Sequence, residues 1–219
     1  MRSSSKRALG AVGAALAALA LTGGPAMADP PSGTYPPLAG TGSDTTQYVM
    51  GGLSAAITIG GERVIGSYDA IGSTQIQTRE NGPLFNRPNG SGNGLRALSA
   101  SINGGNWPAS GGVNVGGQLD FARSSSGPST AGNELTFIPF GLDAVSYAYS
   151  DFGYASVPSY LTLVELRAIY LGTVTTYQDA SGTTRTYVPR LPQTGSGTRQ
   201  FFLQKISVTE AQVAWIGDL

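Results

Sequence analysis

The stretch LPQTGSGTRQFF, residues 191–202, joins a turn with few side chains to a segment with helical composition. Gly195 and Gly197 remove side chains from the turn, while Ser196 and Thr198 leave two hydroxyls in it. The first N–H groups of a helix have no partner within the helix, and that end has a partial positive charge. The stretch therefore fits an anion-binding turn, although Gly, Ser and Thr are also common in ordinary capped loops.

Three further turns rich in glycine and hydroxyl groups occur along the chain. Residues 40–44 (GTGSD) and 90–94 (GSGNG) precede helical patterns, and residues 123–128 (RSSSGP) follow a short apolar run. Strand and helix patterns alternate, which favours an α/β layered fold. Ligands of open α/β sheets bind at the carboxyl ends of the strands, so we infer that the four turns could converge on one site.

Local patterns predict the individual elements. A helix is expected after residue 45, capped by Asp44 or Thr45, because short polar side chains accept hydrogen bonds from the first N–H groups. Two further helices are expected after the capping boxes at Thr162 to Glu165 and at Ser207 to Glu210. Another helix is expected over 95–102, and strands over 38–42, 63–71, 119–122, 135–139, 144–149, 173–176 and 184–188.

The N-terminus has the pattern of a secretory signal peptide. Arg2, Lys6 and Arg7 precede an apolar run over 8–21, and Ala26-Met-Ala28 is typical of a cleavage site. The run is too short to span a membrane. We expect residues 1–28 to be removed by cleavage after Ala28, residues 29–37 to form a Pro-rich linker, and the protein to be secreted to the extracytoplasmic cell surface.

Composition limits the chemistry. The 219 residues contain no His and no Cys, which excludes Ser-His-Asp and Cys-His catalysis, zinc sites of the usual kind, disulfides and a lipid on an N-terminal cysteine. Without residues 1–28, ten basic and thirteen acidic residues remain, a net charge of about −3 with no basic run. We therefore expect no nucleic acid partner, no metal and no cofactor, and a binding protein in preference to an enzyme.

Two other functions fit the same residues less well. A secreted phosphatase would need a nucleophile with a base or a metal, and only Asp44, Asp120 and Ser196 offer one, with no carboxylate cluster of metal-binding spacing. A surface module for partner binding is compatible with the ten tyrosines, although tyrosines on strands more often lie in the core or at its rim.

Six segments, in the same order, resemble those of the phosphate-binding protein family of bacterial ABC phosphate transporters. Together they cover most of residues 38–205, and their joint order is more specific than any one of them. They are GTGSDTTQYV (40–49), GSGNGLRAL (90–98), LDFARSSSGP (119–128), FIPFGLDAVSYAY (137–149), LTLVELRAIYLGTVTTY (161–177) and PQTGSGTRQFF (192–202).

The resemblance implies a two-lobed periplasmic-binding-protein-like (type II) α/β fold, with lobes at 38–130 and 131–219. It also implies a monomeric solute-binding protein that binds an oxyanion, phosphate first, and delivers it to the membrane components of an ABC importer. Carried over by position, the ligand contacts come from the four turns. They would be Asp44 and Thr45, then Ser91 and Asn93, then Ser124 and Ser125, and finally Ser196, Gly197 and Thr198.

The chain departs from the family at three of these positions. Asp44 stands where the family has a ligand-facing Thr, Ser125 where it has an acceptor Asp, and Pro192 where it has an Arg. In one interpretation Asp44 accepts the proton of the oxyanion, and Arg123 or Arg199 replaces the lost Arg. In the other the pocket takes a different oxyanion or a small polar molecule. Asp44 as a simple N-cap and Arg123 as a surface ion pair also stay open.

Length is the other departure. The family members that this chain resembles continue well beyond the last shared motif, whereas this sequence ends at Leu219. We therefore expect the second lobe to be incomplete in this chain, with apolar surface left uncovered.

Overall fold

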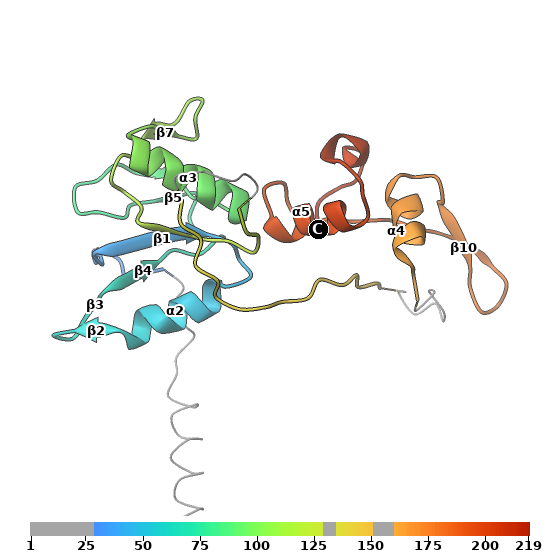
Figure 1. Ribbon diagram of the computed structural model, residues 1–219, viewed down its shortest axis with the longest axis horizontal. Coiled ribbons are helices and arrows are strands. Elements are labelled where there is room, and N and C mark those ends of the chain that lie inside the picture. The colour runs from blue at the N-terminus through green and yellow to red at the C-terminus, as the bar shows by residue number, and fades with distance from the viewer. Residues whose placement is uncertain (1–28, 129–134, 151–159) are drawn as a thin grey trace, which may run out of the picture.

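Three short parallel strands form the centre of the N-terminal half, residues 29–128. The structure, a computed structural model, describes residues 29–128, 135–150 and 160–219 (Figure 1). Strand β1 (Leu38–Gly42) lies between β4 (Ile65–Ser67) and β9 (Phe121–Arg123), with Leu38 opposite Ile65 and Gly40 opposite Phe121. Helix α3 (Ser91–Asn103) packs on β1 and β9, and helix α2 (Gln47–Ala56) lies on the other side of the sheet against β4 (Figure 1). The α/β layers expected from the alternating patterns are thus present in this half.

Glycines allow helix α3 to lie directly on strand β1. A methyl group built on Gly94 would stand 2.5 Å from the α-carbon of Gly42 and 3.2 Å from its nitrogen. Such a distance leaves no room for a side chain, so the first turn of α3 meets the end of β1 backbone to backbone. This contact places the N-terminus of α3 at the carboxyl edge of the sheet.

Short hairpins surround the central sheet and close its core. They pair β2 (Thr58–Ile59) with β3 (Glu62–Arg63), β5 (Gln75–Ile76) with β6 (Phe85–Asn86), and β7 (Asn106–Trp107) with β8 (Val113–Asn114). The buried core consists of Ala39, Tyr68, Ile76, Phe85, Ala97, Leu98, Trp107, Val115 and Leu119.

The C-terminal half, residues 160–219, has a separate core made mainly by helices. It contains α4 (Leu163–Tyr170), the hairpin of β10 (Thr176–Gln178) and β11 (Thr184–Thr186), α5 (Gly197–Lys205) and a 3₁₀ turn (Glu210–Val213). Leu191 and Asp218 form a parallel bridge beside α5. The buried side chains are those of Leu166, Leu191, Leu203, Ile206, Val208, Val213 and Ile216.

Several predicted elements are confirmed with small shifts. The strand at 38–42 is present, and the helix predicted over 95–102 is α3. The capping box of Thr162 is complete, since its Oγ1 accepts the Glu165 N–H while Glu165 accepts the Thr162 N–H. These elements depend on local patterns that the tertiary structure leaves unchanged.

Other predictions are wrong in their details. Helix α2 is flanked by Thr46 without a side-chain capping bond, so neither Asp44 nor Thr45 caps it. The last capping box joins Thr209 to Gln212, and it begins a 3₁₀ turn in place of the α-helix expected after Ser207. Both errors lie at element boundaries, where a shift of one or two residues changes which side chain reaches the free N–H groups.

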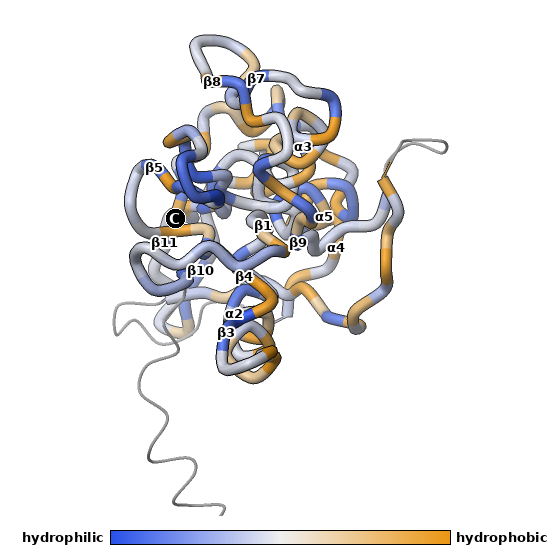
Figure 2. Tube along the Cα trace, turned by 90° about the vertical axis from the view of Figure 1, so that its left-hand side faces the viewer, coloured by the Kyte–Doolittle hydropathy of each residue, from blue (hydrophilic) through white to orange (hydrophobic). Residues whose placement is uncertain are grey.

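The strands predicted over 135–139 and 144–149 are also not formed in the described residues. This segment is extended but pairs with no strand in the part of the chain that the structure describes, and Ile138, Phe140 and Leu142 are exposed. Figure 2 shows much of it as hydrophobic. The apolar runs identify strand-forming residues, but a strand needs a neighbouring edge with which to exchange backbone hydrogen bonds.

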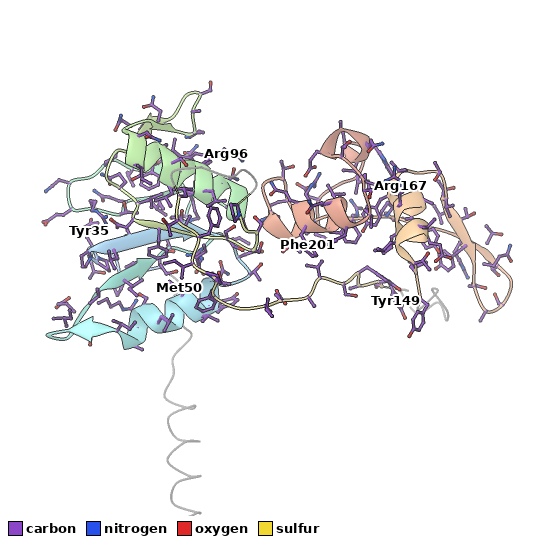
Figure 3. The ribbon with its side chains drawn as sticks, in the orientation of Figure 1. Tyr35, Met50, Arg96, Tyr149, Arg167 and Phe201 are labelled. Carbon is purple, nitrogen blue, oxygen red and sulfur yellow. The ribbon has the colours of Figure 1, made fainter. Side chains whose placement is uncertain are left out.

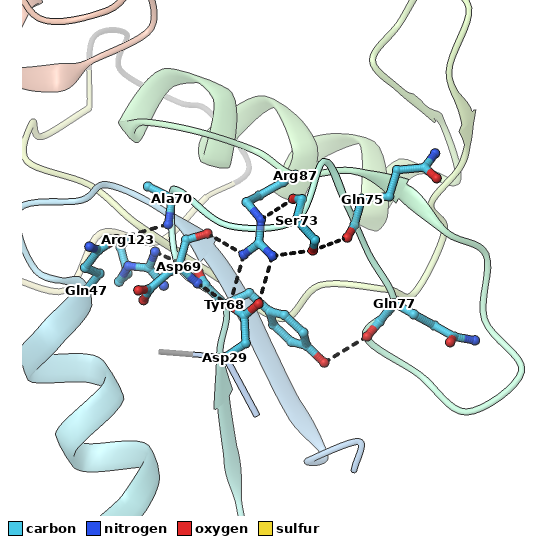
Figure 4. A network of polar contacts seen from close by, with 10 residues as sticks. All are labelled: Asp29, Gln47, Tyr68, Asp69, Ala70, Ser73, Gln75, Gln77, Arg87 and Arg123. Carbon is cyan, nitrogen blue, oxygen red and sulfur yellow. Dashed lines mark hydrogen bonds and ion pairs between the residues drawn. The ribbon is translucent and has the colours of Figure 1, made fainter. Parts of the chain in front are cut away.

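Asp29 anchors the start of the described chain to a buried arginine (Figure 4). The side chain of Arg87 is only 5 % exposed, and its Nη1 and Nη2 donate to the two carboxylate oxygens of Asp29 at 2.9 and 2.8 Å. Its other three N–H groups donate to Asp69 O, Ser73 O and Ser73 Oγ. All five donors of the guanidinium are therefore used, two of them by Asp29.

We expect Asp29→Asn to lower the free energy of unfolding by about 1–3 kcal/mol, because it leaves the buried Arg87 charge without its carboxylate. Urea unfolding followed by tryptophan fluorescence measures this change. Glu62→Gln, which removes an exposed carboxylate from a hairpin, is the matched control and is expected to change little. Equal stability of the two variants would show that the Asp29 pair contributes nothing.

Candidate functional site

Three of the four predicted turns meet where the two halves of the chain touch. Ser91 Oγ at the start of α3 lies 3.0 Å from Ser125 Oγ in the turn after β9, and it also accepts the Ser125 N–H at 3.0 Å. The α-carbon of Gly197, the first residue of α5, packs against both hydroxyls. A methyl group built there would lie 2.5 Å from Ser91 Oγ and would collide with Ser125 Oγ.

Backbone groups continue this contact on the neighbouring residues. The Gly92 N–H donates to Gly195 O at 3.1 Å, and Gln193 Nε2 donates to Asn89 Oδ1 at 2.8 Å. The N-termini of α3 and α5 thus lie beside each other (Figure 1). We call this region the junction and define it by Ser91, Gly92, Ser125, Gly195 and Gly197.

The first predicted turn supports the junction from the side of the sheet. The Gly90 N–H donates to Gly42 O at 3.2 Å, and the Ser43 N–H donates to Arg123 O at 3.0 Å. Asp44 is half-buried and Thr45 is exposed, and neither side chain has a hydrogen bond within the described residues. Of this turn, the structure joins the Gly42 and Ser43 backbone to the other turns, while the Asp44 carboxylate stays available.

The buried side chain of Arg123 lies under the first turn and supports it. Its Nε donates to Ser43 O at 2.9 Å, its Nη1 to Ser67 Oγ at 2.8 Å and its Nη2 to Tyr68 O at 2.8 Å. Burial lowers the pKa of this guanidinium to about 10, although the carboxylates of Asp69, Asp29 and Asp44 oppose the shift. The sequence did not reveal these contacts, and they tie Arg123 to the backbone of the sheet.

Arg199 also faces away from the junction. Its Nε and Nη2 donate to the Glu210 carboxylate, with the shortest contact at 2.8 Å, and its Nη1 donates to Asp218 Oδ1 and Pro192 O, both at 2.9 Å. The hydrogen bond to Glu210 raises the pKa of this guanidinium. Arg199 therefore fastens the end of the chain to α5, and neither predicted arginine presents a free guanidinium at the junction.

The remaining predicted residues differ in whether their side chains already make a hydrogen bond. Ser196 Oγ caps α5 by accepting the Arg199 N–H at 3.3 Å, and Ser124 Oγ donates to Ser126 O at 2.8 Å. Asn93 Nδ2 donates to Asn89 O at 2.7 Å. The half-buried Thr198 hydroxyl has no hydrogen bond within the described residues, so it is a free donor beside the junction.

Thr41 is a polar group that the sequence analysis missed. Its Oγ1 is buried and is one of two side-chain atoms in the described residues that are buried without a hydrogen-bond partner; the other is Asp69 Oδ1. Thr41 shares a face of β1 with Ala39, which belongs to the same buried cluster as Ala97 and Leu98 of α3. An unsatisfied hydroxyl therefore lies beneath α3 near the carboxyl end of β1, and only the observed burial could reveal it.

The residues proposed for an enzyme are not gathered in one place. Asp120 accepts the Ala39 N–H at 2.7 Å near the start of β1, whereas Asp44 follows the other end of that strand. Within the described ranges, no group of three or more Asp and Glu side chains could hold a metal ion.

A comparison with protein-family models, curated proteins and solved structures finds no match to this chain. No helix in the described ranges is long and apolar enough to cross a membrane.

Gly197→Ala tests how closely the halves meet at the junction. The added methyl collides with Ser91 Oγ and Ser125 Oγ, so we expect faster hydrogen exchange at the Ser125 and Gly92 N–H groups and a lower melting temperature. Gly52→Ala on α2, where a methyl meets nothing within 4 Å, is the control and is expected to be neutral or stabilising. Unchanged exchange in Gly197→Ala would mean that the contact is loose in solution.

Proposed function

We propose that the protein is a secreted, two-lobed solute-binding protein that binds an oxyanion, phosphate first, at the junction. The observation that supports this most is the meeting of two helix N-termini. Each N-terminus has a partial positive charge, and the first turns of α3 and α5 contain no acidic residue. The Gly92 and Arg199 N–H groups already donate to Gly195 O and Ser196 Oγ. An anion placed between two positive helix ends would be stabilised by both of them, which makes the junction a suitable place for one.

Hydroxyl groups add donors without adding charge. Ser91 and Ser125 lie at the junction and Thr198 follows Gly197 beside it, and a hydroxyl can donate to an anion or accept from a protonated oxyanion. In the observed arrangement Ser91 and Ser125 bond to each other, so a ligand would replace that bond by bonds to its own oxygens. Binding would then separate the two halves slightly and close them again around the ligand.

Asp44 gives the proposed site a means of discrimination. Its carboxylate is half-buried near the first turn and has no hydrogen-bond partner in the described residues. It can accept a hydrogen bond only from a ligand that still has a proton, such as hydrogen phosphate or hydrogen arsenate, and it repels fully ionised sulfate. A different small polar ligand is the alternative that the same carboxylate allows.

The cellular role follows from the resemblance and from the signal-peptide pattern. In this proposal the secreted monomer captures the oxyanion outside the cytoplasm and delivers it to the membrane components of an ABC importer. No chemical step is required, which agrees with the lack of histidine and cysteine.

Calorimetric titration with phosphate, arsenate and sulfate at two pH values tests the proposal. We expect phosphate and arsenate to bind and sulfate to bind more weakly, because only the first two bring a proton to Asp44. Absence of heat with all three anions would exclude the oxyanion proposal and leave the small polar ligand.

Thr198→Ala should weaken phosphate binding by about 1–3 kcal/mol, the usual loss for a hydrogen bond to a charged group. This variant is cleaner than Ser196→Ala, because Ser196 also caps α5. Thr136→Ala removes an exposed hydroxyl outside the junction and is the matched control. Equal affinity of both threonine variants would remove the α5 turn from the site.

A further inference from the structure

The proposed anion site has no obvious source of full positive charge. Arg123 is bound to three acceptors under the sheet, and Arg199 is paired with Glu210 and Asp218. Helix ends contribute only partial charges, whereas hydrogen bonds from a cation to an anion are markedly stronger than neutral ones. The rim of the junction, however, holds another cation.

Arg96 lies at this rim, in the second turn of α3 (Figure 3). It is exposed, and its Nη2 donates to Asn93 Oδ1 at 2.7 Å, one turn closer to the helix N-terminus. Its other N–H groups make no hydrogen bond in the ranges that the structure describes. The guanidinium is thus held toward the junction with most of its donors free.

Gln200 of α5 approaches the same point from the other half. A methyl group built on Gly92 would lie 3.8 Å from Arg96 Nη1, 3.5 Å from Gln200 Nε2 and 3.4 Å from Gly195 O. Side-chain donors of α3 and α5 therefore lie over the backbone of Gly92, together with the carbonyl oxygen of Gly195. A side chain at residue 92 would intrude on this space.

No carboxylate in the described residues pairs with Arg96. Its observed partner is the neutral amide of Asn93, and the first turn of α3 has no acidic residue. The full positive charge of this guanidinium is therefore not neutralised by a neighbouring side chain in the described ranges.

We propose that Arg96 is the residue that supplies positive charge to the junction and sets its preference for anions, with Asn93 orienting its guanidinium and Gln200 completing the rim. This inference rests on the proposed oxyanion function. It assigns to Arg96 the part that the resemblance gives to the arginine replaced here by Pro192.

The test compares phosphate binding by the wild-type chain and by Arg96→Gln, Arg96→Lys and Arg63→Gln, at about 20 mM and about 200 mM salt. Arg63→Gln makes the same change of charge on the β3 hairpin, outside the junction. We expect Arg96→Gln to bind about tenfold more weakly or worse and with a smaller salt dependence, since one contact between charges is lost. Arg96→Lys should recover part of the affinity, and Arg63→Gln should bind like the wild type.

The outcomes separate this inference from the function on which it rests. If the wild-type chain binds phosphate and Arg96→Gln binds within twofold of it with the same salt dependence, the role of Arg96 is refuted while the proposed function stands. If the wild-type chain binds no oxyanion, both fail. Arg96 is exposed, so the melting temperature of Arg96→Gln should match that of the wild type and exclude misfolding as the cause.

Discussion

The buried guanidinium of Arg123 holds the carboxyl ends of the three parallel strands together. It extends from β9 to Ser43 beyond β1 and to Ser67 and Tyr68 at the end of β4. A buried charge is costly unless hydrogen bonds satisfy it, and removing any of these acceptors would leave it unpaired. The position of the first turn, and with it the contact between Gly42 and the start of α3, depends on this side chain.

A second buried arginine, Arg87, also holds separate segments together through its hydrogen bonds. Arg87 uses all five donors, and through Asp29 it ties the beginning of the described chain to the loop around Asp69 and Ser73 (Figure 4). The N-terminal half has few charged residues, and two of its arginines are buried within it. Its loops are long relative to its strands. Polar networks of this kind therefore fix the loop conformations that backbone pairing in a larger sheet would otherwise fix.

The agreement between the sequence analysis and the structure depends on how local each feature is. The strand at 38–42, helix α3 and the Thr162 capping box follow from residues near one another in the chain, and they were predictable. The segment 135–150 has strand composition, but pairing requires a neighbour that composition alone does not supply. The same limit applies to Arg123 and Arg199, whose partners lie as far away in sequence as Tyr68 and Asp218.

The sequence by itself determined the chemical character of the protein: a weakly charged chain without histidine or cysteine, with four turns of glycine and hydroxyl residues. Only the tertiary structure decided which turns meet and which side chains are free there. It buried Arg123, turned Arg199 toward Glu210 and Asp218, and left Arg96 bonded to Asn93 near the start of α3. Residue types limit what bonds can form, but the partners of a long, flexible side chain are set by packing between segments that are distant in the chain.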